Sequence, residues 1–360
     1  MGPNQTGHFG KGLTVCSKTL LQMRVGQTLG LSILMLTLAT PICGDQPVVR
    51  REKMTEAIIR ALPHLEERGQ WWIDKKGCMS CHRVSFMAWS HLEAKSAGIA
   101  VDTNKLNRWI DWCHDDLFQP IAKENQKHPG EKKINRNLSG GAQMLAALAR
   151  WEASPLQKEK IPLILAALRE GQQNSGQWNP AGQLPSQKRS LVETTHVITL
   201  WNSLAIQTLV KFGSVERNTV EPMLESAAKF LREYEGGESS EWMALKALFL
   251  KRSGNQKGFL KMIAQLSAEQ NEDGGFGWIS GAESDVLATS QIVFLMQEIG
   301  SAEFEKLVTQ AVDFLLKSQQ PDGSWKVQGT KKKAKERHTE TASYWGSAWA
   351  VISLSRALRE

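Results

Sequence analysis

The sequence has two tyrosines, no acidic residue before Asp45, and no apolar run approaching the ~20 residues of a membrane-spanning helix. It also lacks alternating apolar and polar runs, so strands are not expected. No segment forms a Gly-rich phosphate loop, a nucleophile elbow or a Ser/His/Asp set. The basic stretch 330–338 has no interleaved aromatic residues, so we expect no nucleic-acid partner.

Residues 1–44 have the pattern of an export signal. Lys11, Lys18 and Arg24 precede an apolar run at 29–40, and small residues follow it. We therefore predict an exported, periplasmic or extracellular bacterial protein, associated with a membrane only if this signal stays uncleaved. Met23 offers an alternative start. Without this segment the formal net charge falls from +7 to +4, because it holds three cations and no acid.

The remainder predicts helix after helix. Thirteen tryptophans require repeated packing sites or a lined cavity. Apolar residues three and four apart predict an all-α protein of about six hairpins, with helices at 52–67, 84–97, 104–118, 140–152, 157–171, 191–212, 219–234, 239–252, 257–269, 284–299, 302–318 and 340–358.

The joints between these helices repeat. Three segments end a helix in Gln, turn through Gly and present an aromatic residue two positions later: 173–178, 270–276 and 319–325. Their glycines, 176, 274 and 323, are 98 and 49 residues apart, a period typical of stacked helix pairs. The stretch 227–242 is a degenerate fourth copy.

This joint resembles the QW repeat of the squalene–hopene cyclase and prenyltransferase superfamily. The resemblance implies a single α/α toroid, with inner helices around a cavity and outer helices sheathing them. It also implies that each Gln caps a helix end and ties neighbouring hairpins together. We expect N-terminal hairpins over 45–137, continuous with a repeat toroid over 138–360.

The sequence gives little support for cyclase chemistry on this fold. The family's Asp-x-Asp-Asp acid motif is not intact: at 283–286 only Asp285 matches the acid, and a helix N-cap explains Asp285 more simply. A degenerate terpene cyclase that uses Asp285 as its acid is one functional hypothesis. It has less support than haem binding or ligand binding in the toroid cavity. The prenyltransferase zinc pattern has a nominal match in Asp111, Cys113 and His196.

Cys78, Cys81 and His82 form C-x-x-C-H, the pattern of covalent haem c attachment, in which the thiols add to the vinyl groups and the imidazole ligates iron. The surrounding segment resembles exported bacterial proteins that join such an element to a cyclase-like toroid. A disulfide between the two cysteines is one alternative, and a zinc site of Cys78, Cys81, Cys113 and His114 is another.

The leading hypothesis is therefore an exported haem-binding toroid, with electron transfer to a redox partner or haem-linked ligand binding. The main alternative is a haem-free scaffold that binds a lipid or a glycan in the toroid cavity. A small hydrophobic ligand is a further candidate partner. Cavity candidates are His196, Trp201, Trp345 and Trp349, although these side chains could also simply fill a small ring. Whether the protein is an enzyme is left open.

Overall fold

Twelve α-helices make up most of the computed structural model, which describes residues 46–149, 155–180, 189–329 and 336–359. Within these ranges there are isolated β-bridges and short 3-10 or π turns, but no strand. None of the helices in the described part of the chain is long and apolar enough to cross a membrane. The predicted all-α class is confirmed, and the predicted export signal at 1–44 lies outside the described residues.

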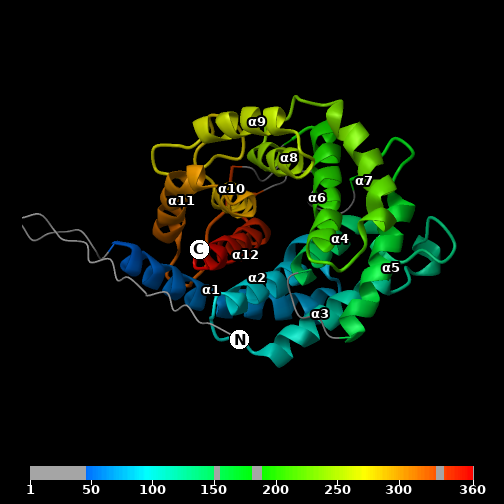
Figure 1. Cartoon of the computed structure of the whole chain (residues 1–360). Helices are drawn as coiled ribbons and strands as arrows, with labels where there is room; N and C mark the ends of the chain where they lie inside the picture. The colour runs from blue at the N-terminus through cyan, green and yellow to red at the C-terminus, as the bar shows by residue number, and fades with distance from the viewer. Residues whose placement is uncertain (1–45, 150–154, 181–188, 330–335, 360) are drawn as a thin grey trace, which may run out of the picture. The chain divides into compact units, whose positions relative to one another are not determined.

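The helices alternate between an outer and an inner layer of a ring (Figure 1). The outer helices are α1 (Gln46–Lys76), α3 (Thr103–Phe118), α5 (Pro155–Gly171), α7 (Arg217–Arg232), α9 (Gln256–Ala268) and α11 (Glu305–Ser318). The inner helices are α2 (Ser85–Ser96), α4 (Leu138–Leu148), α6 (Leu191–Lys211), α8 (Ser240–Arg252), α10 (Val286–Ile299) and α12 (Glu340–Ala357). Each inner helix packs on the next, and α12 packs on α2, so the ring is closed. The predicted single α/α toroid is confirmed.

The two layers differ in how they are buried. Inner helices are buried almost all round: α10, for example, exposes little besides its last turn. Outer helices such as α7 bury one stripe, formed by Val220, Met223, Ala227 and Leu231. A helix that is apolar on every face must be enclosed, whereas a single apolar stripe needs cover on one side. The sequence therefore distinguishes inner from outer helices. Inner helices are apolar on every face, whereas outer helices are apolar along one stripe.

Side-chain caps fix where the inner helices begin. Ser190, Ser239, Asp285 and Thr339 each accept a hydrogen bond from a backbone N–H of the following first turn. Such caps satisfy donors that have no partner within the helix. They set the start of α6, α8, α10 and α12 at the same end of the ring.

The Gln residues of the repeats join neighbouring outer helices. The side-chain amide of Gln172 donates to Met223 O of α7, and that of Gln270 donates to Leu307 O of α11, each at 2.9 Å. Each amide also donates to the carbonyl oxygen of its own turn glycine, Gly176 or Gly274. The first repeat therefore begins one residue earlier than predicted, at Gln172 rather than at 173.

The turn glycines sit against the backbone of the neighbouring outer helix. A Cβ on Gly176 would lie 2.1 Å from Ser226 O, and one on Gly274 would lie 2.5 Å from Gln310 O. Both glycines have positive φ, at 97° and 86°. Gly is required at these positions because close approach and left-handed backbone coincide.

The repeat aromatic residue anchors the hairpin from inside. Trp178 and Trp325 are fully buried, and each donates from Nε1 to a carbonyl oxygen ten residues earlier, Leu168 O and Leu315 O, at 2.7 Å. Phe276 takes this place in the middle repeat. The excess of Trp is thus partly explained by a reused packing site.

The first helix is longer than predicted, running to Lys76 rather than ending at 67. The sequence favours an earlier end because Gly69 is a poor helix former. In the structure a Cβ on Gly69 would lie 2.2 Å from Met87 Sδ and 2.9 Å from the Tyr344 hydroxyl. Gly69 therefore permits close packing of α1 on α2 and α12, and its helix propensity is overridden.

Candidate functional site

The centre of the ring is filled by aromatic side chains of the inner helices. The ring of Trp349 lies between 5.2 and 5.7 Å from those of Phe86, Trp89, Trp201 and Phe294. The cavity beside this cluster measures about 20 Å³, enough for roughly one water. Among the described residues this pocket is too small for a ligand, and Trp201 and Trp349 pack there as core.

Of the two other predicted cavity residues, one faces the outer layer and one lies beside this cluster. His196 stacks on Phe230 and Tyr234 of the α7 segment, with centroids 4.3 and 4.4 Å apart, so it faces outward and not toward the ring centre. Burial is the main cause that lowers its pKa. Trp345 lies edge-on to Phe86 at 6.0 Å, and its buried Nε1 has no hydrogen-bond partner among the described residues.

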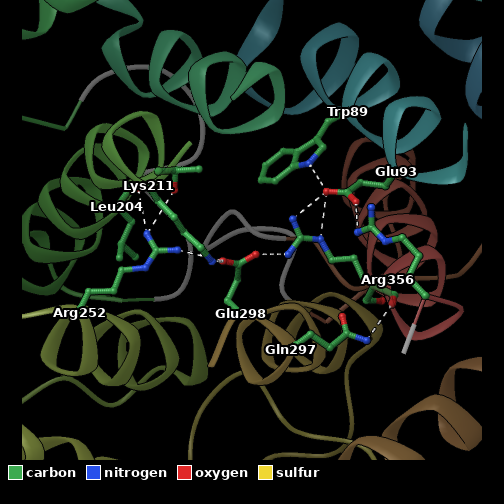
Figure 2. A network of polar contacts seen from close by, with 11 residues as sticks. Trp89, Glu93, Leu204, Lys211, Arg252, Gln297, Glu298 and Arg356 are labelled. Carbon is green, nitrogen blue, oxygen red and sulfur yellow. Dashed lines mark hydrogen bonds and ion pairs between the residues drawn. The ribbon is translucent and has the colours of Figure 1, made fainter. Parts of the chain in front are cut away.

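Charged side chains cross the ring where the inner helices end, a set we call the floor network (Figure 2). Arg356 donates to Glu93 Oε1 through Nε at 3.0 Å and Nη2 at 2.7 Å, and to Glu298 through Nη1. Arg252 donates to Glu298 Oε2 at 2.9 Å. Trp89 Nε1 also donates to Glu93, at 3.1 Å. These buried carboxylates are therefore paired and close the ring at this end.

Another buried carboxylate lies near the other end. Glu241 accepts hydrogen bonds from Trp201 Nε1 at 2.8 Å, Gln291 Nε2 at 3.2 Å and Arg189 Nη1 at 2.6 Å. The side chains of Glu241 and Arg189 are each 3% exposed. Because its oxygens are already engaged, this group explains the stability of the ring better than a reaction.

The C-x-x-C-H segment forms a π turn, Ser80–Val84, that leads into α2. Cys78 is half-buried, and its carbonyl oxygen accepts from Trp72 Nε1 at 2.9 Å. His82 is 1% exposed, with the Trp72 ring edge-on at 5.8 Å. The side chain of Cys81 lies outside the described residues. A haem on His82 would have to displace the packing that now buries the imidazole, and haem c attachment at these residues stays a prediction that an intact mass would test.

The predicted zinc ligands on α3 are buried and uncharged. Burial raises the pKa of the Cys113 thiol and lowers that of His114 to about 4. Among the described side chains no three His, Cys, Asp or Glu residues are placed to share a metal. This corrects the Asp111, Cys113 and His196 match, whereas the zinc set that includes Cys81 stays a prediction.

Asp285 caps α10. Its Oδ1 accepts from Ala288 N at 3.0 Å, as the N-cap interpretation of the sequence requires. A carboxylate that accepts from backbone N–H at a helix start is stabilised in its charged form. This geometry favours the structural role of Asp285 over that of a protonated acid.

A groove between α1 and α3, which we call the α1–α3 groove, is large enough for a ligand. Its volume is about 730 Å³, within the range of small-molecule sites. Its floor and walls include apolar side chains of both helices and of the turn after α2. Its polar and aromatic lining residues are Glu66, Glu67, Gln70, Trp71, Asp74, His91, Asp102 and Trp109.

The spacing of residues on α1 produces one wall of this groove. Glu66, Gln70 and Asp74 are four residues apart, as are Glu67 and Trp71, so they share a helix face. Trp71 is 39% exposed, with Arg68 and Lys76 over its ring at 5.2 and 5.7 Å. This spacing could have been found in the sequence, but the predicted helix ended before Trp71.

His91 and Trp109 form the inner part of the groove. His91 is 3% exposed, and its Nδ1 bonds to Met87 O at 2.8 Å, so Nδ1 carries the proton. Its Nε2 is buried without a partner among the described residues, and the Trp109 ring lies edge-on at 4.9 Å. Burial lowers the pKa of His91 to about 4, so at neutral pH Nε2 is an unused acceptor.

No family model and no curated protein matches the chain. Solved structures do match. A polysaccharide lyase covers 86% of this chain and 97% of its own at a TM-score of 0.55 and 12% identity. A possible member of the GH105 family from Klebsiella pneumoniae covers 92% and 99% at 0.55 and 13%. A type II terpene cyclase from Scytonema covers 87% and 99% at 0.52 and 16%.

At these identities the matches show that the chain shares the α/α toroid of glycan-acting proteins and a terpene cyclase. They do not show membership of the squalene–hopene cyclase family. They also correct the leading functional hypothesis of a haem protein for electron transfer, because the matching toroids include those of a polysaccharide lyase, glycosidases and a terpene cyclase. The glycan-binding alternative agrees better with them.

Proposed function

We propose that this protein binds a glycan, and that the α1–α3 groove is the binding site. The observation that carries the proposal is the lining of the groove, where indole rings of Trp71 and Trp109 stand beside carboxylates and a neutral imidazole. Sugars present apolar C–H faces that pack on aromatic rings and hydroxyls that donate to carboxylates. The toroid shared with a polysaccharide lyase and GH105-type proteins supports the same ligand class.

The groove suits a sugar better than a lipid. Glu66, Glu67, Asp74 and Asp102 border it, and burying such groups against an acyl chain without a hydrogen-bonding partner is costly. Among the described residues, the pocket beside the central aromatic cluster measures about 20 Å³, too small for a lipid or terpene. We therefore place the glycan between two outer helices rather than inside the ring.

Calorimetric titration with a panel of neutral, anionic and amine-bearing oligosaccharides tests the proposal. We expect at least one to bind, with affinity falling about ten-fold or more in Trp71→Ala, since a stacking indole contributes about 1.4 kcal/mol or more. Phe212→Ala is the matched control, because Phe212 is similarly exposed, at 44%, on another part of the ring. Failure of every oligosaccharide to bind, or equal losses in both variants, would overturn the proposal.

A further inference from the structure

The α1–α3 groove has far more acceptors than donors. Four carboxylates line it, and its lining includes no Lys or Arg. Gln70 uses its Nε2 to donate to Asp74 at 3.0 Å and its Oε1 to accept from Trp109 at 3.4 Å. The polar lining thus offers a ligand mainly oxygen atoms and one imidazole nitrogen.

The negative charge of the groove is only partly compensated. Lys105 pairs with Glu66, but Glu67 makes no hydrogen bond or ion pair with the described residues, and Asp74 accepts only from neutral Gln70. Asp102 caps α3, and hydrogen bonds from Lys105 N and Asn104 N lower its pKa. These hydrogen bonds favour the charged form of Asp102.

The buried imidazole points to the same kind of ligand. His91 Nε2 is an acceptor without a partner among the described residues, and leaving a buried acceptor unpaired is costly. A ligand that supplies an N–H or O–H at this depth would recover that cost. Of the cations near the groove, Lys105 pairs with the groove carboxylate Glu66, and Arg68 and Lys76 lie over the Trp71 ring at the rim.

We infer that the groove takes an oligosaccharide whose sugars carry free, protonated amines, a deacetylated aminoglycan. This inference rests on the proposed function and narrows its ligand class. Ammonium groups supply both the charge and the donors that the groove lacks, while the sugar rings pack on the indoles. Acetylated amines would bring an extra acceptor instead of a cation, and uronates would bring repulsive carboxylates.

Three tetrasaccharides of equal length test the inference by calorimetry at mildly acidic pH: the glucosamine tetramer, the N-acetylglucosamine tetramer and the galacturonate tetramer. We expect the glucosamine tetramer to bind about ten-fold tighter than the acetylated one at low salt, with the advantage shrinking as salt screens the charges. The galacturonate tetramer should bind most weakly. A tetralysine peptide should bind more weakly than the glucosamine tetramer, because it has no sugar rings to stack.

Glu67→Gln combined with Asp74→Asn should reduce the preference for the glucosamine tetramer over the acetylated one several-fold. Glu272→Gln removes an exposed carboxylate outside the groove and is the control. Equal or tighter binding of the acetylated or uronate tetramer would overturn the inference and leave the glycan proposal standing. Tetralysine binding as tight as glucosamine would also overturn it, whereas no binding by any sugar would remove the proposed function itself.

Discussion

Gln319, at the end of α11, donates from its side-chain amide to the carbonyl oxygen of Ala57 in α1, 2.8 Å away and 262 residues earlier in the chain. The same motif elsewhere joins one outer helix to the next, but here it joins the last to the first. The neighbouring glycine repeats the pattern, because a Cβ on Gly323 would lie 2.2 Å from Arg60 O. The same local motif thus joins successive outer helices and also joins the last outer helix to the first.

Gly323→Ala should destabilise the ring at this closure. Its φ is 83°, and the added methyl would collide with Arg60 O, so we expect a loss of about 2–4 kcal/mol in the free energy of unfolding. Urea unfolding followed by circular dichroism measures the loss. Gly213→Ala is the control, with a φ of 69° and open space around the glycine, and should cost about 1 kcal/mol. Equal losses would show that close approach at the seam is unimportant.

An ion pair joins the π turn before α2 to α12 beside the same seam. Arg83 is fully buried between the rings of Trp72 at 4.8 Å and Tyr344 at 4.0 Å, and it donates to both Glu340 oxygens at 2.7 and 2.6 Å. Glu340→Gln should leave the guanidinium charge without its counter-ion. We expect a loss of about 2 kcal/mol, less than for a fully enclosed pair because Glu340 is 49% exposed.

The pH dependence of this pair has a definite sign. Burial favours the neutral Glu340 acid, but the hydrogen bonds and charge of Arg83 outweigh it and lower the pKa below the ordinary 4.5. A lowered carboxyl pKa stabilises the fold above about pH 4.5, and this contribution is lost as the pH falls through the lowered value. Glu340→Gln should remove that part of the acid sensitivity. Glu235→Gln, in the exposed pair with Lys261, should change stability by less than about 0.5 kcal/mol.

His91 and His114 should make the protein less stable between neutral and mildly acidic pH. Burial lowers both pKa values from 6.5 to about 4, so the unfolded chain binds protons that the folded chain does not. Stability is then fully present above about pH 6.5 and falls on acidification, by on the order of 2 kcal/mol per histidine at about pH 5. Comparing unfolding free energies at both pH values tests this. His91→Asn should flatten the dependence, whereas His128→Asn, on the surface, should leave it unchanged; an unaltered slope in His91→Asn would contradict the assignment.

Removing one carboxylate charge from the floor network should greatly lower the free energy of unfolding. Glu298 is 3% exposed on its side chain and pairs with Arg356 and Arg252, so Glu298→Gln leaves two largely buried guanidinium groups short of a counter-charge. We expect a loss of about 3–5 kcal/mol in thermal or urea unfolding. Adding Arg356→Met should recover part of this loss if the two residues are coupled, while additive losses would argue against coupling.

Much of the fold could be predicted because the helical period and the repeated joints are local signals. Gln270, Gly274 and the aromatic residue after them identify a hairpin joint without any long-range information. The groove could not be predicted in the same way. It depends on α1 continuing past Gly69, which is decided by Met87 and Tyr344 packing against that glycine from other helices.

The candidate cavity residues show the same limit. Helical periodicity places Trp201 and His196 on an inner helix, but does not determine which of them faces the centre. Trp201 packs on Trp349, while His196 stacks on Phe230 of the outer layer. How far the centre is filled depends on side chains from several helices meeting at once, and no single segment encodes that.

The contact between Arg51 Nη2 and Leu358 O, 2.5 Å long, places the beginning of the first helix beside the end of the last. A ring closed in this way has no structurally privileged starting point. A chain opened at another turn between hairpins, with a short linker spanning residues 51 and 358, would retain every packing partner of the helices described. The hairpins could therefore follow one another along the chain in any cyclic order and still form the same ring. Their actual order is then a matter of ancestry.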